Sequence, residues 1–426
     1  MTPRARLCGE VTASTRGASR TSRYAAVTET ALRRSLPSPI KTHQKGHNMK
    51  HTVLCGIDRQ SELKSLVSGR KTALLTAASG ISKTGNPTYE ILAGLSDLRI
   101  LLAPEHGLAS AMQDGGFSKE DGVPHAETGA SLYDITALRG GDRLTELLRG
   151  VDLAVYDIQD VGARFYTYIS NLSQLMRAAK AAGKPVLVLD RPNPIGNRVC
   201  EGLILDESRH SSFVGEYAVP TRYALTVGEY ARYINAEKGI GCELHVLPCE
   251  GWAPHVHYDE TDLIWVNPSP NIPTVNCALN YIGSCVYEAT NLSEGRGTTR
   301  PFDWLGAPFV DEKALARDMN ALCLPGVLFR PLSFTPMFNK HAGSVCRGVE
   351  LHITDREAYR PFETMLHMLR HFKKYPEFTV NRASMALRIG QDILTDDYDP
   401  AWVLARAAED TKRFCENVEK YRLYFG

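Results

Sequence analysis

Between residues 72 and 247, short apolar runs alternate with segments whose apolar positions recur at helical spacing. The runs predict buried strands at residues 72–76, 98–103, 151–155, 186–189 and 244–247. Helices are predicted at 88–95 and 142–148. A third helix is predicted around Leu172, Leu175, Met176 and Ala179, which share one face, and a fourth from the Thr226/Glu229 capping box to about residue 236. Strands that alternate with helices favour right-handed βαβ units, so the pattern predicts an α/β fold with a Rossmann-like parallel sheet.

A proline-rich stretch separates this region from the rest of the chain. Pro268, Pro270 and Pro273 follow one another within six residues, which excludes a helix or a central strand. We therefore predict a Rossmann-like domain at 49–272 and a smaller α+β domain at 273–426. In the second domain a strand is predicted at 348–354, and helices are predicted at 357–372 and 401–422.

Two further segments lack a clear apolar period. Residues 1–48 carry seven Arg and two Lys against two Glu, a net charge of 9 − 2 = +7, and we expect an extension outside the folded protein, with Met49 as the start. Residues 108–131 contain four glycines, which predicts a long loop that is either a lid over a site or a plain surface excursion.

Charge and composition exclude several classes of protein. The whole chain has a net charge of +1, so the part beyond residue 48 carries 1 − 7 = −6 and offers no basic stripe for nucleic acid. Ten cysteines without a C-x-x-C pair are typical of reduced thiols, and no run is long enough for a membrane helix. We expect a cytoplasmic protein, or a secreted one if the start is wrongly assigned. No dinucleotide or ATP motif is present, and His255-Val-His257 alone does not make a metal site, so no cofactor and no metal are expected.

Polar side chains gather directly after three of the predicted strands. The second strand leads into Glu105 and His106, the third into Asp157, Gln159, Asp160, Arg164 and Tyr166, and the fourth into Asp190, Arg191 and Asn193. Open α/β sheets bind ligands beyond the carboxyl ends of their strands, which makes these residues candidates for a polar-ligand site. The alternative is a set of capped strand ends with satisfied Asp–Arg pairs.

A second polar block, at residues 288–299, follows the predicted boundary and contains Asn291, Glu294 and Arg296. Acids on both walls of one cleft suit glycoside hydrolysis, in which one carboxyl protonates the leaving oxygen and the other attacks or activates water. The arginines indicate that the ligand carries a carboxylate or a phosphate. The residues alone therefore predict a hydrolase of a polar, anionic substrate.

Five long motifs occur in a fixed order along the chain. They are Pro104-Glu-His-Gly107, Asp157-Ile-Gln-Asp-Val-Gly-Ala-Arg-Phe-Tyr-Thr-Tyr168, Leu189-Asp-Arg-Pro-Asn-Pro194, Pro268-Ser-Pro-Asn271 and Thr290-Asn-Leu-Ser-Glu-Gly-Arg-Gly-Thr298. From about Leu63 to Gly426 the chain resembles a bacterial family of exo-β-N-acetylmuramidases that was long labelled as of unknown function.

The resemblance implies a Rossmann-like domain, a smaller C-terminal domain and an active-site cleft between them. It also implies release of N-acetylmuramic acid from the non-reducing ends of peptidoglycan fragments, with the lactyl carboxylate of that sugar as the anionic group. The chain departs from the family pattern at Ala77-Ala78, at 108–110, at Tyr223-Ala224 and at Ala289, and these departures bear on the exact substrate.

Within this family pattern we expect Glu105 to be the general acid/base, with Glu294 or Asp160 as the second catalytic carboxyl. The expected substrate ligands are His106, Asp157, Gln159, Arg164, Tyr166, Asp190, Arg191, Asn193, Asn271, Asn291 and Arg296. The expected partner is a small carbohydrate, and the oligomeric state is left open. Two alternatives remain: a protein that binds muropeptides without cleaving them, and a hydrolase of a related amino sugar.

Overall fold

The computed structural model of the chain describes residues 50–425 except 114, 117–119 and 395–396. The predicted extension at 1–48 and the predicted start at Met49 lie outside the described residues. The strands are β1 (Lys71–Thr76), β2 (Asp97–Ala103), β3 (Asp121–Pro124), β4 (Ser131–Asp134), β5 (Leu153–Asp157), β6 (Val186–Leu189), β7 (Leu244–Leu247), β8 (Trp304–Ala307), β9 (Val327–Phe334) and β10 (Cys346–Ile353).

The α-helices are α1 (Gln60–Val67), α2 (Thr88–Leu95), α3 (Arg143–Arg149), α4 (Tyr168–Ala182), α5 (Glu207–His210), α6 (Val227–Glu237), α7 (Val275–Ser284), α8 (Glu312–Ala321), α9 (Pro361–Phe372), α10 (Arg382–Ile389) and α11 (Pro400–Val418). Short 3-10 helices are η1 (Gly56–Asp58), η2 (Tyr258–Glu260), η3 (Cys285–Ala289) and η4 (Glu419–Tyr421).

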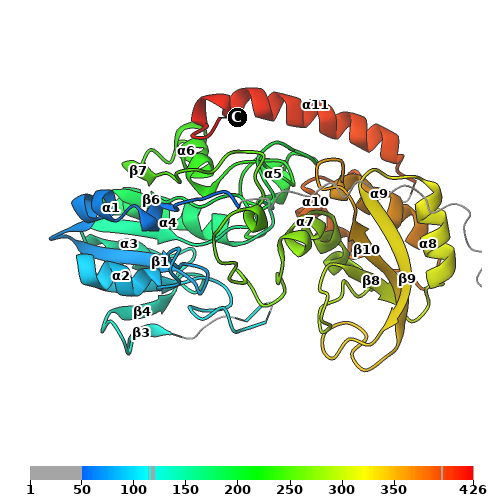
Figure 1. The fold of residues 1–426 in the computed structure, drawn as a ribbon, viewed down its shortest axis with the longest axis horizontal. Helices are drawn as coiled ribbons and strands as arrows, with labels where there is room; N and C mark the ends of the chain where they lie inside the picture. Colours follow the sequence, from blue (N-terminus) through cyan, green and yellow to red (C-terminus); the bar gives the residue numbers. More distant parts are fainter. Residues whose placement is uncertain (1–49, 114, 117–119, 395–396, 426) are drawn as a thin grey trace, which may run out of the picture. The chain divides into compact units, whose positions relative to one another are not determined.

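Seven strands form one sheet in the order β3-β4-β2-β1-β5-β6-β7 (Figure 1). All neighbours pair in parallel except β3, which runs antiparallel to β4 at the edge. The chain leaves β1 toward β2 and β4, then returns to the other side of β1 with β5, so the order reverses between β1 and β5. Ligands of doubly wound folds bind beyond the carboxyl ends of the strands at such a reversal. The prediction of a Rossmann-like sheet is confirmed.

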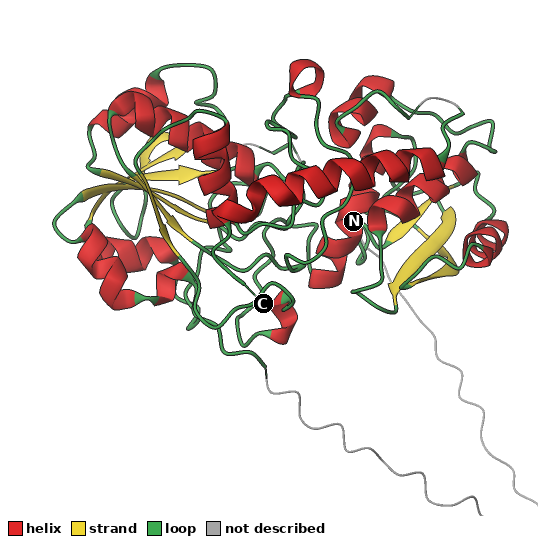
Figure 2. Cartoon of the chain, turned by 90° about the horizontal axis from the view of Figure 1, so that it is seen from above, coloured by secondary structure: helices red, strands yellow, loops and turns green. Residues whose placement is uncertain are grey.

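Alternate side chains of the central strands enter two separate cores, because successive residues of a strand point to opposite faces. Leu74 and Val155 belong to a core shared with α1 and α2, whereas Leu75 and Tyr156 belong to a core shared with α3, α4 and α6. Figure 2 shows helices on both sides of the sheet, which is seen nearly edge-on. Burial on both faces explains why these strands are continuous apolar runs.

A smaller antiparallel sheet follows in the order β8-β10-β9. Pro331 lies in β9, an edge strand, where a missing N–H is tolerated. Val349 and Leu351 of β10 pack with Leu315 of α8 and Leu366 of α9 in a third core. The predicted smaller α+β domain at the C-terminal side is confirmed, and its boundary at 272/273 stays a prediction.

The last described residues return to the seven-stranded sheet. The Tyr424 hydroxyl donates to Asp190 at 2.7 Å, and the Leu423 backbone N–H donates to Glu229 at 2.9 Å. Tyr424 also packs edge-on against Trp252. Residues far beyond the predicted boundary therefore complete the packing of the first domain.

The structure corrects several predicted elements. The predicted loop at 108–131 contains β3, whose exposed and glycine-containing residues give no alternating signal. The strand predicted at 151–155 begins at Leu153 and includes Asp157. The helix predicted from 357 begins at Pro361, since proline is favoured in the first turn of a helix, and the helix predicted to 422 ends at Val418. Elements β8, β9, α7, α8 and α10 were not predicted.

Candidate active site

Glu105 is placed by a tight turn at the carboxyl end of β2. Pro104 follows the strand, and His106 and Gly107 both have positive φ, of 73° and 77°. A left-handed histidine is uncommon, and the turn is fixed by hydrogen bonds from the Gly107 N–H to the Pro104 carbonyl and between the His106 ring and the Met112 carbonyl at 2.8 Å. Strain of this kind is typical of functional turns.

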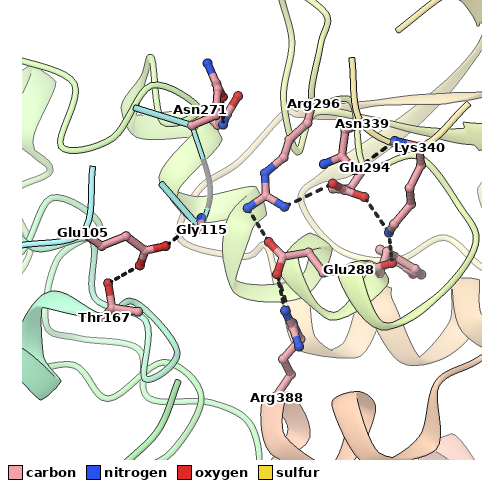
Figure 3. A network of polar contacts seen from close by, with 12 residues as sticks. Glu105, Gly115, Thr167, Asn271, Glu288, Glu294, Arg296, Asn339, Lys340 and Arg388 are labelled. Atoms are coloured by element: carbon pink, nitrogen blue, oxygen red, sulfur yellow. Dashed lines mark hydrogen bonds and ion pairs between the residues drawn. The ribbon is translucent and has the colours of Figure 1, made fainter. Parts of the chain in front are cut away.

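The Glu105 carboxyl lies in a pocket and is held by neutral donors. The Thr167 hydroxyl donates to one oxygen at 2.8 Å, and the Gly115 N–H donates to the other at 3.1 Å (Figure 3). Only 8% of the residue is exposed, and within the described residues it forms no ion pair. A carboxyl in this environment can hold or release a proton without breaking a salt bridge.

The pocket is partly enclosed and has a cavity volume of about 110 Å³. Its walls come from the loops after β2 and β5, from the 269–272 stretch, and from α7, η3, the 296–302 loop and α10, so both domains contribute. The lining residues are Glu105, His106, Phe165, Tyr166, Thr167, Phe213, Val214, Ser269, Asn271, Ile272, Tyr281, Cys285, Glu288, Arg296, Phe302 and Arg388.

Opposite Glu105, the wall is built from ion pairs (Figure 3). Glu288 accepts from Arg296 at 2.5 Å and from two nitrogens of Arg388. Arg296 also reaches Glu294 at 3.2 Å, and Lys340 binds the other oxygen of Glu294 at 3.0 Å. Burial on its own would raise the pKa of Glu288, but Arg296 and Arg388 outweigh burial and lower the pKa. Of these groups, Glu288, Arg296 and Arg388 line the pocket and carry a net charge of +1, whereas Glu294 and Lys340 do not line it.

Five of the predicted site residues line this pocket: Glu105, His106, Tyr166, Asn271 and Arg296. Asn271 donates to Gln113 at 3.0 Å, which ties the 268–273 stretch to the segment after Glu105. Burial raises the pKa of Tyr166 well above its ordinary value, so its hydroxyl stays protonated and can serve as a hydrogen-bond donor.

The polar residues after β5 and β6 are placed elsewhere, in the scaffold. Asp157 and Arg191 form a fully buried ion pair, with Nε to Oδ1 at 2.5 Å. Asp190 accepts from Thr226 and from the N–H of Gly228 at the start of α6. These charged side chains are hydrogen-bonded or ion-paired to neighbouring segments of the protein. Asp190 in particular accepts from a backbone N–H at the start of a helix, so its role is structural.

Further predicted residues also make structural contacts. Arg164 donates to the carbonyls of Leu203 at 2.6 Å, Val219 at 2.8 Å and Arg388 at 2.7 Å, and burial lowers its pKa to about 9. Burial raises the pKa of Asp160 to about 6; one of its oxygens accepts from Gly162 and Tyr223. Gln159, Asn193 and Asn291 donate to backbone carbonyls. In the described part of the chain, these residues do not line the pocket, and Glu294 does not line it either.

Sequence reasoning missed several residues that do line it, among them Thr167, Ser269, Tyr281, Glu288 and Arg388. Glu288 opens the second polar block and was passed over in favour of Glu294. Arg388 lies on α10, and no local motif marks it.

Metal and membrane features were searched in the described residues only. They contain no group of three or more His, Cys, Asp or Glu arranged to hold a metal ion. None of the described helices combines the length and the apolar character that a membrane crossing requires.

A pocket with two carboxyls, shared by a Rossmann-like domain and a smaller antiparallel domain, suits an enzyme that hydrolyses glycosidic bonds. Sequence models of the N-terminal and C-terminal domains of the exo-β-N-acetylmuramidase NamZ match residues 72–276 and 279–424. The chain belongs to this family of glycosidases, which confirms the resemblance seen in its motifs.

Known relatives agree with this assignment. The peptidoglycan β-N-acetylmuramidase NamZ of Bacillus subtilis is 40% identical over 344 residues, which is 80% of this chain and 82% of that protein. A crystal structure of a DUF1343 family protein from Bacteroides fragilis superposes with a TM-score of 0.79 at 28% identity, over 88% of this chain and 100% of that one. A second such protein has a TM-score of 0.69 at 24% identity, over 87% and 99%, and shows the fold alone.

Proposed function

We propose that this chain releases N-acetylmuramic acid from the non-reducing ends of peptidoglycan fragments. The observation that carries the proposal is the Glu105 carboxyl, which lies in the pocket, accepts from Thr167 and Gly115 without an ion pair among the described residues, and faces Glu288, Arg296 and Arg388, whose net charge is +1. A protonated Glu105 can donate to the glycosidic oxygen. The positive wall suits a sugar whose lactyl group is an anion, and the arginines that line the pocket are Arg296 and Arg388.

The reaction is tested with the disaccharide in which N-acetylmuramic acid is β-linked to N-acetylglucosamine. The wild type is expected to release both sugars. Because a sugar alkoxide leaves only when it is protonated, Glu105→Gln should lower kcat by about 10²–10⁴-fold with the fold intact. Asp160→Asn is the matched control, since Asp160 lies outside the pocket, and it should keep kcat within about tenfold.

Substrate choice is tested with chromogenic β-glycosides of N-acetylmuramic acid and of N-acetylglucosamine, which lacks the lactyl group. Cleavage of the first alone would support recognition of the carboxylate. A folded wild type that binds N-acetylmuramic acid but cleaves neither compound would contradict the hydrolase and support a muropeptide-binding protein. The expected cytoplasmic location stays a prediction, and identification of the mature N-terminus in cells tests it.

A further inference from the structure

Glycoside hydrolysis by two carboxyl groups requires a second acid that faces the same space as the first. Among the described acids, only Glu105 and Glu288 line the pocket. Figure 3 shows their carboxyl groups pointing toward each other from the two sides of the site. Glu294 is only 1% exposed, and its two oxygens are taken by Arg296 and Lys340.

Glu288 is also held in a fixed position and a fixed state of charge. It lies in η3, a buried 3-10 helix, and its carboxylate is gripped by guanidiniums from two different segments, Arg296 after η3 and Arg388 on α10. Arg388 is itself positioned, because its backbone carbonyl accepts from the buried Arg164 at 2.7 Å. Ion pairs of this kind favour the charged form of the carboxyl.

Glu105 and Glu288 face the pocket with different partners. Glu105 has a hydroxyl and an amide as partners, and Glu288 has two cations. The two cations hold Glu288 in its charged form, which is what the carboxylate of such a pair needs.

We propose that Glu288, held between Arg296 and Arg388, is the second carboxylate of the reaction centre and faces the anomeric carbon opposite Glu105. This inference rests on the proposed function. Glu105 gives its proton to the glycosidic oxygen, which leaves with the electron pair of the C1–O bond. The positive charge that remains on C1 and the ring oxygen lies against the Glu288 carboxylate. Water then forms the new bond to C1, and the proton it loses goes to the Glu105 carboxylate.

The competing explanation is that Glu288 only orients the two arginines for an anionic ligand. Leaving groups separate the two roles. An aryl β-glycoside of N-acetylmuramic acid releases a phenolate without protonation, whereas the disaccharide needs a proton. Loss of the acid should therefore matter for the disaccharide alone, and loss of the charge that stabilises the transition state should matter for both.

The experiment compares kcat/KM of Glu105→Gln, Glu288→Gln and Glu294→Gln on both substrates. We expect Glu105→Gln to keep most of its activity on the aryl glycoside, and Glu288→Gln to lose about 10²–10³-fold on both. Glu294→Gln is the matched control, because Glu294 pairs with the same Arg296 but does not line the pocket, and with the fold intact it should lose less than about tenfold. An equal loss in Glu288→Gln and Glu294→Gln would overturn the proposal, as would a loss of Glu288→Gln activity on the disaccharide alone.

Binding of free N-acetylmuramic acid by calorimetry gives a second measurement. If Glu288 acts on the transition state, the Kd of free N-acetylmuramic acid for the Glu288→Gln variant stays within about threefold of the wild-type value. If the Kd rises as much as kcat/KM falls, Glu288 only positions the arginines and the proposal fails.

Two further variants cover the case in which Glu288→Gln does not fold. Glu288→Asp keeps the charge and should fold, yet lose activity because its carboxylate is withdrawn. Added formate should raise the rate of Glu288→Ala by at least about tenfold, because formate can occupy the space of the missing carboxylate. A Glu288→Ala variant that folds and binds the sugar but is not rescued by formate would contradict the proposal. Failure of the wild type on the aryl glycoside would refute the proposed function itself, whereas an active wild type with an active Glu288→Gln would refute only this inference.

Discussion

Asp160 allows a test that separates scaffold from catalysis at one residue. Its carboxyl is fully buried, and burial raises its pKa from 3.8 to about 6, although Tyr223 and Gly162 donate to it. The Asp160→Asn side chain can keep both of these hydrogen bonds on its amide oxygen. Its amide nitrogen then takes the place of Oδ1, which has no hydrogen-bond partner among the described residues.

The effect on stability follows from the difference between the folded and unfolded pKa. The native state binds more protons than the unfolded chain between pH 3.8 and about 6, so the free energy of unfolding falls as the pH rises through this window. A difference of 6 − 3.8 = 2.2 pH units corresponds to about 3 kcal/mol at 1.36 kcal/mol each. About 2 kcal/mol of this lies between pH 4.5 and 7.5.

The Asp160→Asn variant lacks this titration. The free energy of unfolding of the variant minus that of the wild type should therefore rise by about 2 kcal/mol from pH 4.5 to 7.5. Denaturant unfolding of both proteins across the range measures the difference, and any strain from the amide adds a constant that does not depend on pH. A difference that stays flat within about 0.5 kcal/mol would refute the reasoning.

Two further changes test the scaffold. Asp157→Asn removes the counter-charge of the buried Arg191 guanidinium and should lower the free energy of unfolding by about 3–5 kcal/mol. The double variant Asp157→Asn/Arg191→Met should recover part of this loss. Denaturant unfolding measures both variants, and a loss under about 1 kcal/mol in the single variant would contradict a buried ion pair. Tyr424→Phe removes the hydroxyl that donates to Asp190 and should lower the free energy of unfolding by about 1.5–3 kcal/mol, with kcat unchanged within about twofold. A large fall in kcat at unaltered stability would instead show that Tyr424 has a role in the reaction.

The parallel sheet could be predicted because burial on both faces leaves a clear record in the sequence. The run at 186–189 is buried throughout and matches β6 residue for residue. Edge strand β3 leaves no such record, since its side chains are mostly exposed and it pairs on one side only. Strand β9 has the mixed pattern of an edge strand with a proline, and it was missed for the same reason.

The candidate site was predictable in part. Glu105 could be found because a proline and a glycine frame it at the end of a strand. Asp157 and Arg191 also stand at strand ends, yet they neutralise each other, and a sequence does not show which strand-end charges will meet. Arg388 reaches Glu288 from 100 positions away, so only the packing of α10 against η3 reveals the pair.

The contact between Tyr424 and Asp190 has a consequence for how the protein is made. The two residues are 234 positions apart, and a ribosome that adds about 5–20 residues per second needs on the order of 10–50 s to cover that distance. Strand β7 ends at Leu247, so all seven strands of the first sheet are synthesised well before the hydroxyl that completes the surroundings of this buried carboxylate. Nascent chains of this protein therefore pass through a period in which the strands of the sheet are present and the buried Asp190 carboxylate lacks one of its hydrogen-bond donors.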